Sequence, residues 1–221
     1  LEAKYGLDKP MAERYFTYIS DAAHGDFGDS LKQRGRTVMD IIATKFPVSA
    51  RLGGMAVVLA LCVGVPLGVL AAYKRGTFID SLFSVIATCG IAVPGFVICT
   101  LLLYVFGVKL QWLPTLGLKS AQSYIMPVVA LAAYPTSYIM RLMRSSMLDV
   151  LGQDYMRTAK AKGLSQKVSL FKHALRNAIL PVITYVGPML AYTLTGSFVT
   201  EKIFTIPGLG GEFIKAINGR D

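Results

Sequence analysis

The chain has 221 residues, of which 53% are hydrophobic, and its formal net charge is +10 at pH 7. So high an apolar content argues against an ordinary soluble domain. Because the basic residues flank apolar stretches, the charge is explained by orientation in a membrane, and we expect no nucleic acid partner.

The first 51 residues form a head with two amphipathic segments and a turn between them. Pro10, shortly after Asp8, predicts a helix start, because proline is well suited to the first helical turn. Apolar residues then recur at helical spacing, at Met11, Tyr15, Tyr18, Ile19 and Ala22. Gly and Asp residues at 25–29 predict a turn, and a second amphipathic piece covers 38–46. We expect this head to lie at the outer membrane surface or to pack on the spans.

Four stretches that contain no Asp, Glu, Lys or Arg follow the head, at residues 52–73, 81–108, 120–140 and 177–200. A helix needs about 20 apolar residues to cross the hydrocarbon core, so each stretch is long enough to span. A soluble protein with four buried helices is the alternative, but a chain of this size rarely buries so much. The sequence therefore predicts an all-α polytopic membrane protein with four transmembrane helices.

Every predicted span contains proline, at Pro66, Pro94, Pro127, Pro135, Pro181 and Pro188. Proline removes a backbone hydrogen bond and bends a helix, which is common in transporters and in membrane proteins generally. Gly64 and Gly68 form a small-xxx-small pair that suits close helix packing. The absence of charge within the spans argues against a proton-driven transporter.

The loops between spans fall on two sides of the membrane. Residues 74–80 and 141–176 lie on one side, and the other side holds 1–51, 109–119 and 201–221. Lys and Arg are denser on the first side, which the positive-inside rule makes cytoplasmic. Because nothing before residue 1 is present to carry the head across, we expect one span upstream and another downstream of Asp221.

No motif in the chain predicts a cofactor, a metal or a catalytic centre. The sequence G-x-x-x-x-G-K-[ST], which binds ATP phosphates, is absent. The glycine-rich stretch 207–211 is expected to be a turn. The three cysteines and two histidines have no metal or redox spacing.

The loop 141–176 predicts a short basic helix, a sharp turn and a second helix. Asp154 can cap a helix that begins near Tyr155, and Gly163 is placed to end it in the left-handed conformation. Ser165 can start the next helix. Leu148, Leu151, Tyr155 and Ala159 are predicted to share one face, and Val168, Phe171 and Leu175 to form an apolar stripe. The pattern alone leaves open a loop beside anionic headgroups or a helix inserted into a groove of a soluble partner.

Residues 157–164, together with 173–181, resemble the EAA loop of binding-protein-dependent ABC permeases. Ala159 and Gly163 match the E-A-A-x-x-x-G pattern, whereas Arg157 stands where Glu is common and Thr158 where the first Ala is common. These departures, and the long interval from the glycine to the proline that ends the motif, are typical of the oligopeptide and dipeptide branch.

Further stretches also resemble that branch, namely residues 24–28, 46–50, 206–210 and 218–221. The resemblance therefore covers almost the whole chain, and it is closest to the first of the two permease subunits of an oligopeptide importer. It implies the type I ABC importer permease fold with six spans in the full protein, in the bacterial or archaeal inner membrane.

The resemblance also implies partners. An extracytoplasmic peptide-binding protein delivers substrate, a second related permease subunit shares the pathway, and two cytoplasmic ATPase subunits hydrolyse ATP, so this chain is not itself an enzyme. Membrane lipid surrounds the spans. The implied ATPase-coupling residues are Tyr155, Arg157, Thr158, Ala159, Lys160, Ala161, Lys162, Gly163 and Leu164. Substrate contacts are not indicated. An importer of nickel or glutathione with the same architecture, and a passive channel or facilitator, are the alternatives.

Overall fold

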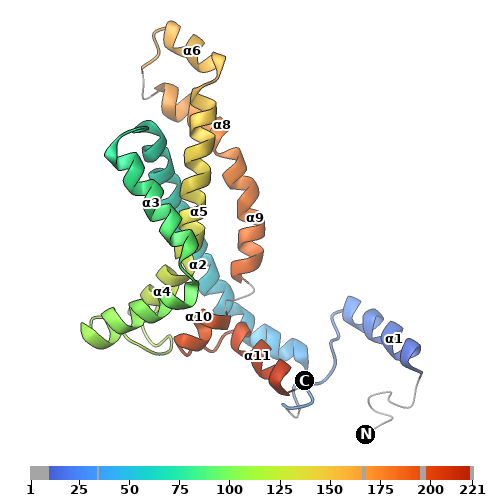
Figure 1. Ribbon diagram of the computed structural model, residues 1–221. Helices are drawn as coiled ribbons and strands as arrows, with labels where there is room; N and C mark the ends of the chain where they lie inside the picture. Colours follow the sequence, from blue (N-terminus) through green and yellow to red (C-terminus); the bar gives the residue numbers. More distant parts are fainter. Residues whose placement is uncertain (1–9, 34, 166–167, 195–197, 220–221) are drawn as a thin grey trace.

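The computed structural model describes residues 10–33, 35–165, 168–194 and 198–219. These residues form an elongated helical bundle with a narrow end and a splayed end (Figure 1). Within these ranges the only β contact is an isolated antiparallel bridge between Asp29 and Thr37. The all-α prediction is confirmed for the described part of the chain.

Helix α1, Met11–Ala23, begins after Pro10 as predicted. None of its residues is buried, and its apolar side chains are exposed to solvent, Met11 by 84%. Figure 1 shows α1 standing beside the splayed end, away from the long helices. Of the two placements expected for this segment, packing on the spans is therefore not observed.

Helix α2, Val38–Tyr73, is continuous over 36 residues and joins the predicted head to the first predicted span. Its start is fixed by a capping box, in which Thr37 Oγ1 accepts from Asp40 N at 3.1 Å and Asp40 Oδ2 accepts from Thr37 N at 3.3 Å. Because helical geometry is not interrupted between 38 and 73, the boundary expected after residue 51 lies inside this helix.

The stretch 81–108, expected as one span, is divided. Helix α3, Phe78–Ala92, and the pair α4, Gly95–Leu102, and η2, Leu103–Lys109, meet at a bend of 102°. Val93 has extended backbone angles (φ −75°, ψ 124°), as expected for a residue before proline, and Pro94 then begins α4. The proline therefore breaks the helix here instead of bending it slightly.

The remaining elements run from η3 to α11. They are η3 Ala121–Tyr124, α5 Ile125–Leu151, α6 Asp154–Ala161, η4 Ser169–Ala174, α8 Leu175–Ala178, α9 Leu180–Leu194, α10 Phe198–Ile203 and α11 Leu209–Gly219. Within the described ranges, three helical stretches are long and apolar enough to cross a membrane, or four if the bent pair α3 and α4 counts as one. They are Val38–Tyr73, Ala121–Leu151 and Leu180–Ile203, the last of which runs over the undescribed residues 195–197.

Glycine allows α2 and α5 to pack closely along the centre of the bundle. A Cβ on Gly64 would lie 2.9 Å from the carbonyl oxygen of Thr136, and one on Gly68 would lie 2.6 Å from that of Met140. Both distances are too short for a real side chain. The close packing predicted from the small-xxx-small pair is confirmed.

The connections gather at the two ends of the bundle. The turn between α2 and α3, the helix α6 and the short helices η4 and α8 lie at the narrow end, named here the α6 end (Figure 1). Helices α1, α4, α10 and α11 lie at the opposite, splayed end, named here the α11 end. The loops that the sequence placed on one side of the membrane therefore share one end of the molecule.

Candidate functional site

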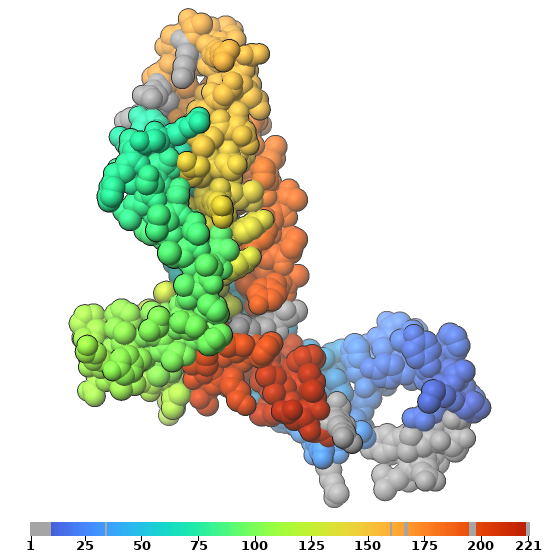
Figure 2. Space-filling model, viewed as in Figure 1, coloured from blue at the N-terminus to red at the C-terminus, as the bar shows by residue number. Residues whose placement is uncertain are grey.

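Helix α6 forms the tip of the α6 end (Figure 2). Helix α5 ends at Leu151, the chain turns at 152–153, and α6 begins at Asp154, the residue that was expected to cap a helix beginning near Tyr155. The turn rotates α6 relative to α5, so the common face predicted for Leu148, Leu151, Tyr155 and Ala159 is wrong. Met156 is 1% exposed and Ala159 7% exposed, whereas Tyr155 is 36% exposed.

The buried face of α6 is fixed to its neighbours by apolar packing. Met156 belongs to one hydrophobic cluster with Met147 and Val150 of α5 and with Leu170 and Ala174 of η4. Sequence reasoning did not include Met156 among the site residues. Met156 and Ala159 have the i, i+3 spacing of residues on one helix face, and this spacing could have identified Met156.

Tyr155 makes a second attachment. Asn177 Nδ2 donates to Tyr155 Oη at 2.8 Å, which joins α6 to the short helix α8. Between them lies a cavity of about 460 Å³ whose other lining residues are Lys172, His173 and Arg176. The basic surface at this end therefore extends beyond α6 itself.

Gly163 ends α6 in the predicted left-handed conformation, with φ of +78°. Leu164 N donates to Ala159 O at 3.3 Å, the 6→1 hydrogen bond of a Schellman motif. A Cβ at Gly163 would meet no atom within 4 Å, so the requirement for glycine is one of backbone conformation and not of space.

Ser165, predicted to start the next helix, lies four residues before η4, and residues 166–167 are outside the described part of the chain. Its Oγ accepts from Val168 N at 3.4 Å, and Ser169 N donates to its carbonyl oxygen at 2.9 Å. Of the apolar stripe predicted at Val168, Phe171 and Leu175, Val168 and Phe171 are exposed, while Phe171 and Leu175 border one cavity of about 720 Å³. The buried face is formed by Leu170, Ala174 and Ala178. The helix here is a π-helix, η4, whose wider turn shifts the periodicity that an α-helix would have.

The outer face of α6 is polar and basic. The residues that it and its C-terminal turn expose are Tyr155, Arg157, Thr158, Ala161, Lys162, Gly163 and Leu164. Arg157 Nη1 lies 3.5 Å from Asp154 Oδ1, and both side chains are at least 79% exposed. This ion pair therefore contributes little to the stability of the fold. Lys160 lies in α6, but its side chain is outside the described part, as is Lys167. The candidate site is thus a short helix fixed on one face and basic on the other.

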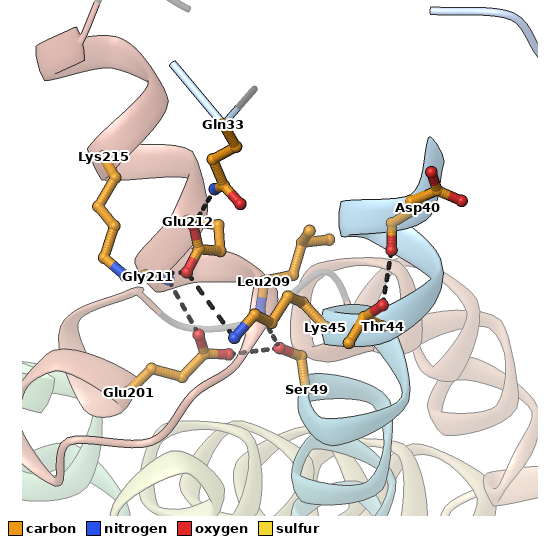
Figure 3. Close-up of polar contacts among 10 residues, drawn as sticks. All are labelled: Gln33, Asp40, Thr44, Lys45, Ser49, Glu201, Leu209, Gly211, Glu212 and Lys215. Carbon is orange, nitrogen blue, oxygen red and sulfur yellow. Dashed lines mark hydrogen bonds and ion pairs between the residues drawn. The ribbon is translucent and has the colours of Figure 1, made fainter. Parts of the chain in front are cut away.

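A buried carboxylate organises the opposite end of the molecule (Figure 3). Glu201 is 1% exposed, and its Oε1 accepts from Ser49 Oγ at 2.6 Å while Oε2 accepts from Gly211 N at 3.1 Å. Ser49 Oγ in turn accepts from Leu209 N at 2.8 Å. The N-terminus of α11 is therefore held by groups from α2 and α10, and the carboxylate also suits the positive end of the helix dipole.

Glycine makes room for this carboxylate. A Cβ on Gly208 would lie 2.5 Å from the carboxyl carbon of Glu201, and one on Gly210 would lie 2.8 Å from the Cα of Phe198. The turn predicted at 207–211 is therefore limited to 207–208, because 209–211 form the first turn of α11. Sequence reasoning missed Glu201 because it lies one residue beyond the uncharged stretch 177–200.

Residues 64–221 match the family described as "Binding-protein-dependent transport system inner membrane component". The chain belongs to this family. It is therefore a transport subunit of the inner membrane, as the EAA-like segment predicted.

Two relatives illustrate the similarity. The chain is 48% identical to the dipeptide transport system permease protein DppB of Bacillus subtilis (strain 168), over 100% of this chain and 72% of the relative. It is 44% identical to the oligopeptide transport system permease protein OppB of Salmonella typhimurium (strain LT2), over 100% of this chain and 73% of the relative.

Solved structures share the fold. The inward-facing MetNI methionine ABC transporter has a TM-score of 0.64 at 18% identity, with 80% of this chain and 81% of that chain covered. An amino acid ABC transporter crystallised with histidines has a TM-score of 0.57 at 17% identity, covering 81% and 79%. The family member described here therefore has the type I ABC importer permease fold.

Proposed function

We propose that this permease imports peptides with a binding protein, a second related permease and two ATPase subunits, and that α6 is its ATPase-coupling helix. The observation that carries the proposal is the arrangement of α6: one face is buried on the bundle and the other is free and basic. The peptide substrate is supported by the names of relatives at 42% to 48% identity, which are dipeptide and oligopeptide permeases.

The burial of α6 supports a mechanical role. Because Met156 belongs to a cluster shared with α5 and η4, and Ala159 is also buried, a force on α6 would act on both helices and would not be absorbed in a loose loop. Closure of an ATPase pair would displace α6, and α5 and α9 would tilt with it. Rigid-body movement of helix groups about a central site is the general form of alternating access.

The charge of the α6 end supports both its orientation and its partner. We infer that this end is cytoplasmic, in accord with the positive-inside rule. Acidic groups on the ATPase would contact Arg157 on α6, Lys162 in the turn after it, and Lys172, His173 and Arg176 around the neighbouring cavity. The α11 end would then face the binding protein.

The decisive experiment changes the turn that positions α6. Gly163→Val in an assembled complex of both permeases and both ATPases should strongly reduce peptide uptake and binding-protein-stimulated ATPase activity, because a β-branched residue is strained at φ +78°. Gly163→Asn is the matched control, since asparagine adopts this conformation more readily and should retain most activity.

Unchanged uptake and ATPase coupling in the Gly163→Val complex would overturn the coupling role. A second experiment reverses charge with Arg157→Glu and Lys160→Glu. We expect the ATPase subunits to copurify poorly with this variant. Normal copurification would show that electrostatic docking does not contribute.

Substrate and energy source are tested by uptake into liposomes. Labelled peptide should enter only when binding protein, ATP and active ATPase subunits are present. Entry of peptide without the ATPase subunits would favour the passive channel. Entry of nickel or glutathione, but not of peptide, would favour those importers of the same architecture.

A further inference from the structure

A cavity of about 630 Å³ opens between the bend that joins α3 to α4, the N-terminal half of α5, and the helices α9 and α10. Three prolines border it, one on each of three walls: Pro94 at the bend, Pro135 on α5 and Pro188 on α9. The volume falls in the range of about 300–1,000 Å³ that small-molecule sites have. The cavity lies away from α6, and its α10 wall includes Thr200, which directly precedes Glu201 in the chain.

Tyrosines line this cavity from two helices. Tyr134 on α5 is 48% exposed and Tyr192 on α9 is 72% exposed, while Tyr185 is half-buried. Tyr138 packs against two of them: its ring centroid is 6.3 Å from that of Tyr134 and 4.4 Å from that of Tyr185. The walls are therefore preorganised by ring stacking. This site, bordered by Tyr134, Tyr185 and Tyr192, is named here the tyrosine cavity.

The lining of the tyrosine cavity combines hydroxyl groups with a complete lack of charge. Its lining residues include no Asp, Glu, Lys, Arg or His. Among the residues that the structure describes, none forms a hydrogen bond with the hydroxyl of Tyr134 or Tyr185. Each hydroxyl can both donate and accept.

These properties fit a peptide better than a lipid tail. A peptide backbone presents donors and acceptors at every residue, and its side chains carry either sign or none. Tyrosine hydroxyls can bind the backbone, and the aromatic faces can contact side chains without repelling one sign of charge. A hydrocarbon tail would leave the same hydroxyls unpaired, which costs free energy.

We propose that the tyrosine cavity is part of the peptide passage, in which Tyr134, Tyr185 and Tyr192 bind the peptide backbone without selecting its side-chain charge. The proposal rests on the proposed import of peptides. The second permease would supply the opposite wall, and bending at the three prolines would change the width of the cavity between the two states of transport.

The test introduces a charge and measures charge selectivity. Wild type and Tyr134→Glu are assembled with their partners in liposomes and given acidic, neutral and basic peptides of equal length. Wild type should transport all three similarly once binding-protein affinity is matched. Tyr134→Glu should lower the ratio of acidic to basic peptide uptake about tenfold, the effect of like-charge repulsion at close range. A role in packing alone would lower uptake of all peptides equally.

Two further variants complete the experiment. Tyr192→Glu introduces the charge at a more exposed position and gives the same readout if Tyr134→Glu does not assemble. Tyr104→Glu is the matched control, because Tyr104 is 58% exposed on η2 and does not line the cavity, so its ratio should equal that of wild type.

Equal acidic-to-basic ratios for wild type, Tyr134→Glu and Tyr192→Glu would overturn the proposal. Crosslinking of a photoreactive lipid, but not of a photoreactive peptide, to Tyr192 would also overturn it and assign the cavity to lipid. Failure of wild type to import any peptide would instead contradict the proposed function, so the two failures are distinguishable.

Discussion

Arg144 on α5 donates two parallel hydrogen bonds to Asp80 at the start of α3, from Nε to Oδ1 at 2.6 Å and from Nη2 to Oδ2 at 2.9 Å. Gly76 N also donates to Oδ2 at 3.0 Å, so the turn between α2 and α3 joins the same contact. Asp80 is 5% exposed. This bidentate pair binds α3 to α5 close to the α6 end, where the proposed force from α6 would enter the bundle.

Removal of either partner should destabilise the permease. Asp80→Ala leaves the Arg144 guanidinium partly buried without its carboxylate, and we expect a loss of about 3 kcal/mol or less, because the Arg144 side chain keeps 30% exposure. The measurement is thermal unfolding in detergent of both single variants and of Asp80→Ala/Arg144→Ala. The loss of unfolding free energy in the double variant should be smaller than the sum of the two single losses, by at least about 1 kcal/mol. Strict additivity would show that the pair does not couple α3 to α5.

Adjacent glycines on α2 offer a matched pair of substitutions. A Cβ on Gly53 would overlap the carbonyl oxygen of Thr193 and lie 2.7 Å from its carbonyl carbon, whereas a Cβ on Gly54 would meet nothing within 4 Å. Gly53→Ala should therefore destabilise by roughly 1–3 kcal/mol through separation of α2 and α9. Gly54→Ala should be neutral or stabilising by up to about 1 kcal/mol, since alanine favours the helix. Equal melting temperatures for the two variants would contradict this packing.

Glu201 should control the order of the start of α11. In Glu201→Gln an NH2 group replaces one carboxylate oxygen, so either Ser49 Oγ or Gly211 N loses its acceptor. We expect the variant to be less stable by about 1–2 kcal/mol. Glu201→Ala leaves both donors without that acceptor and should cost more. Hydrogen exchange at the amides of Leu209 and Gly211 should accelerate in the order wild type, Gln, Ala. Unaltered exchange in the alanine variant would show that the N-terminus of α11 is held by other contacts.

Local stereochemistry explains what the sequence predicted correctly. Gly163 and Ser165 act through backbone conformation and a hydrogen bond three residues away, and Gly64 and Gly68 act through the lack of a side chain. Such properties belong to a residue and its near neighbours, so a single sequence contains them.

Contacts between segments that are distant in the sequence could not be predicted in this way, and neither could burial that depends on a π-helix. Asp80 and Arg144 both lie just outside the uncharged stretches, and nothing local pairs them. The burial of Met156 depends on a turn between α5 and α6, and the burial of Leu170 depends on the π-helical winding of η4. Pro94 was expected to bend a span, but the 102° break needed the extended conformation of Val93 as well.

Acid should weaken the attachment of α11 through Glu212. Its Oε1 accepts from Lys215 Nζ at 2.8 Å and lies 3.8 Å from Lys45 Nζ on α2, and its Oε2 accepts from Gln33 Nε2 at 3.1 Å. The Lys215 hydrogen bond, followed by the charges of Lys215 and Lys45, holds the pKa of this carboxyl below its usual value, against the opposing effect of burial.

Since the folded pKa of Glu212 lies below the unfolded value of about 4.3, its contribution to stability is complete above that value and is lost as pH falls through the folded pKa. Glu212→Gln should therefore be less stable than wild type at neutral pH, by up to about 1 kcal/mol, and the difference should shrink toward pH 3. Melting temperatures of both proteins across pH 3–7 test this, with Lys215→Met as a second variant that should reduce the same acid-sensitive difference. A wild-type-to-variant difference that stays constant over this range would show that the ionised carboxylate does not stabilise the contact between α11 and α2.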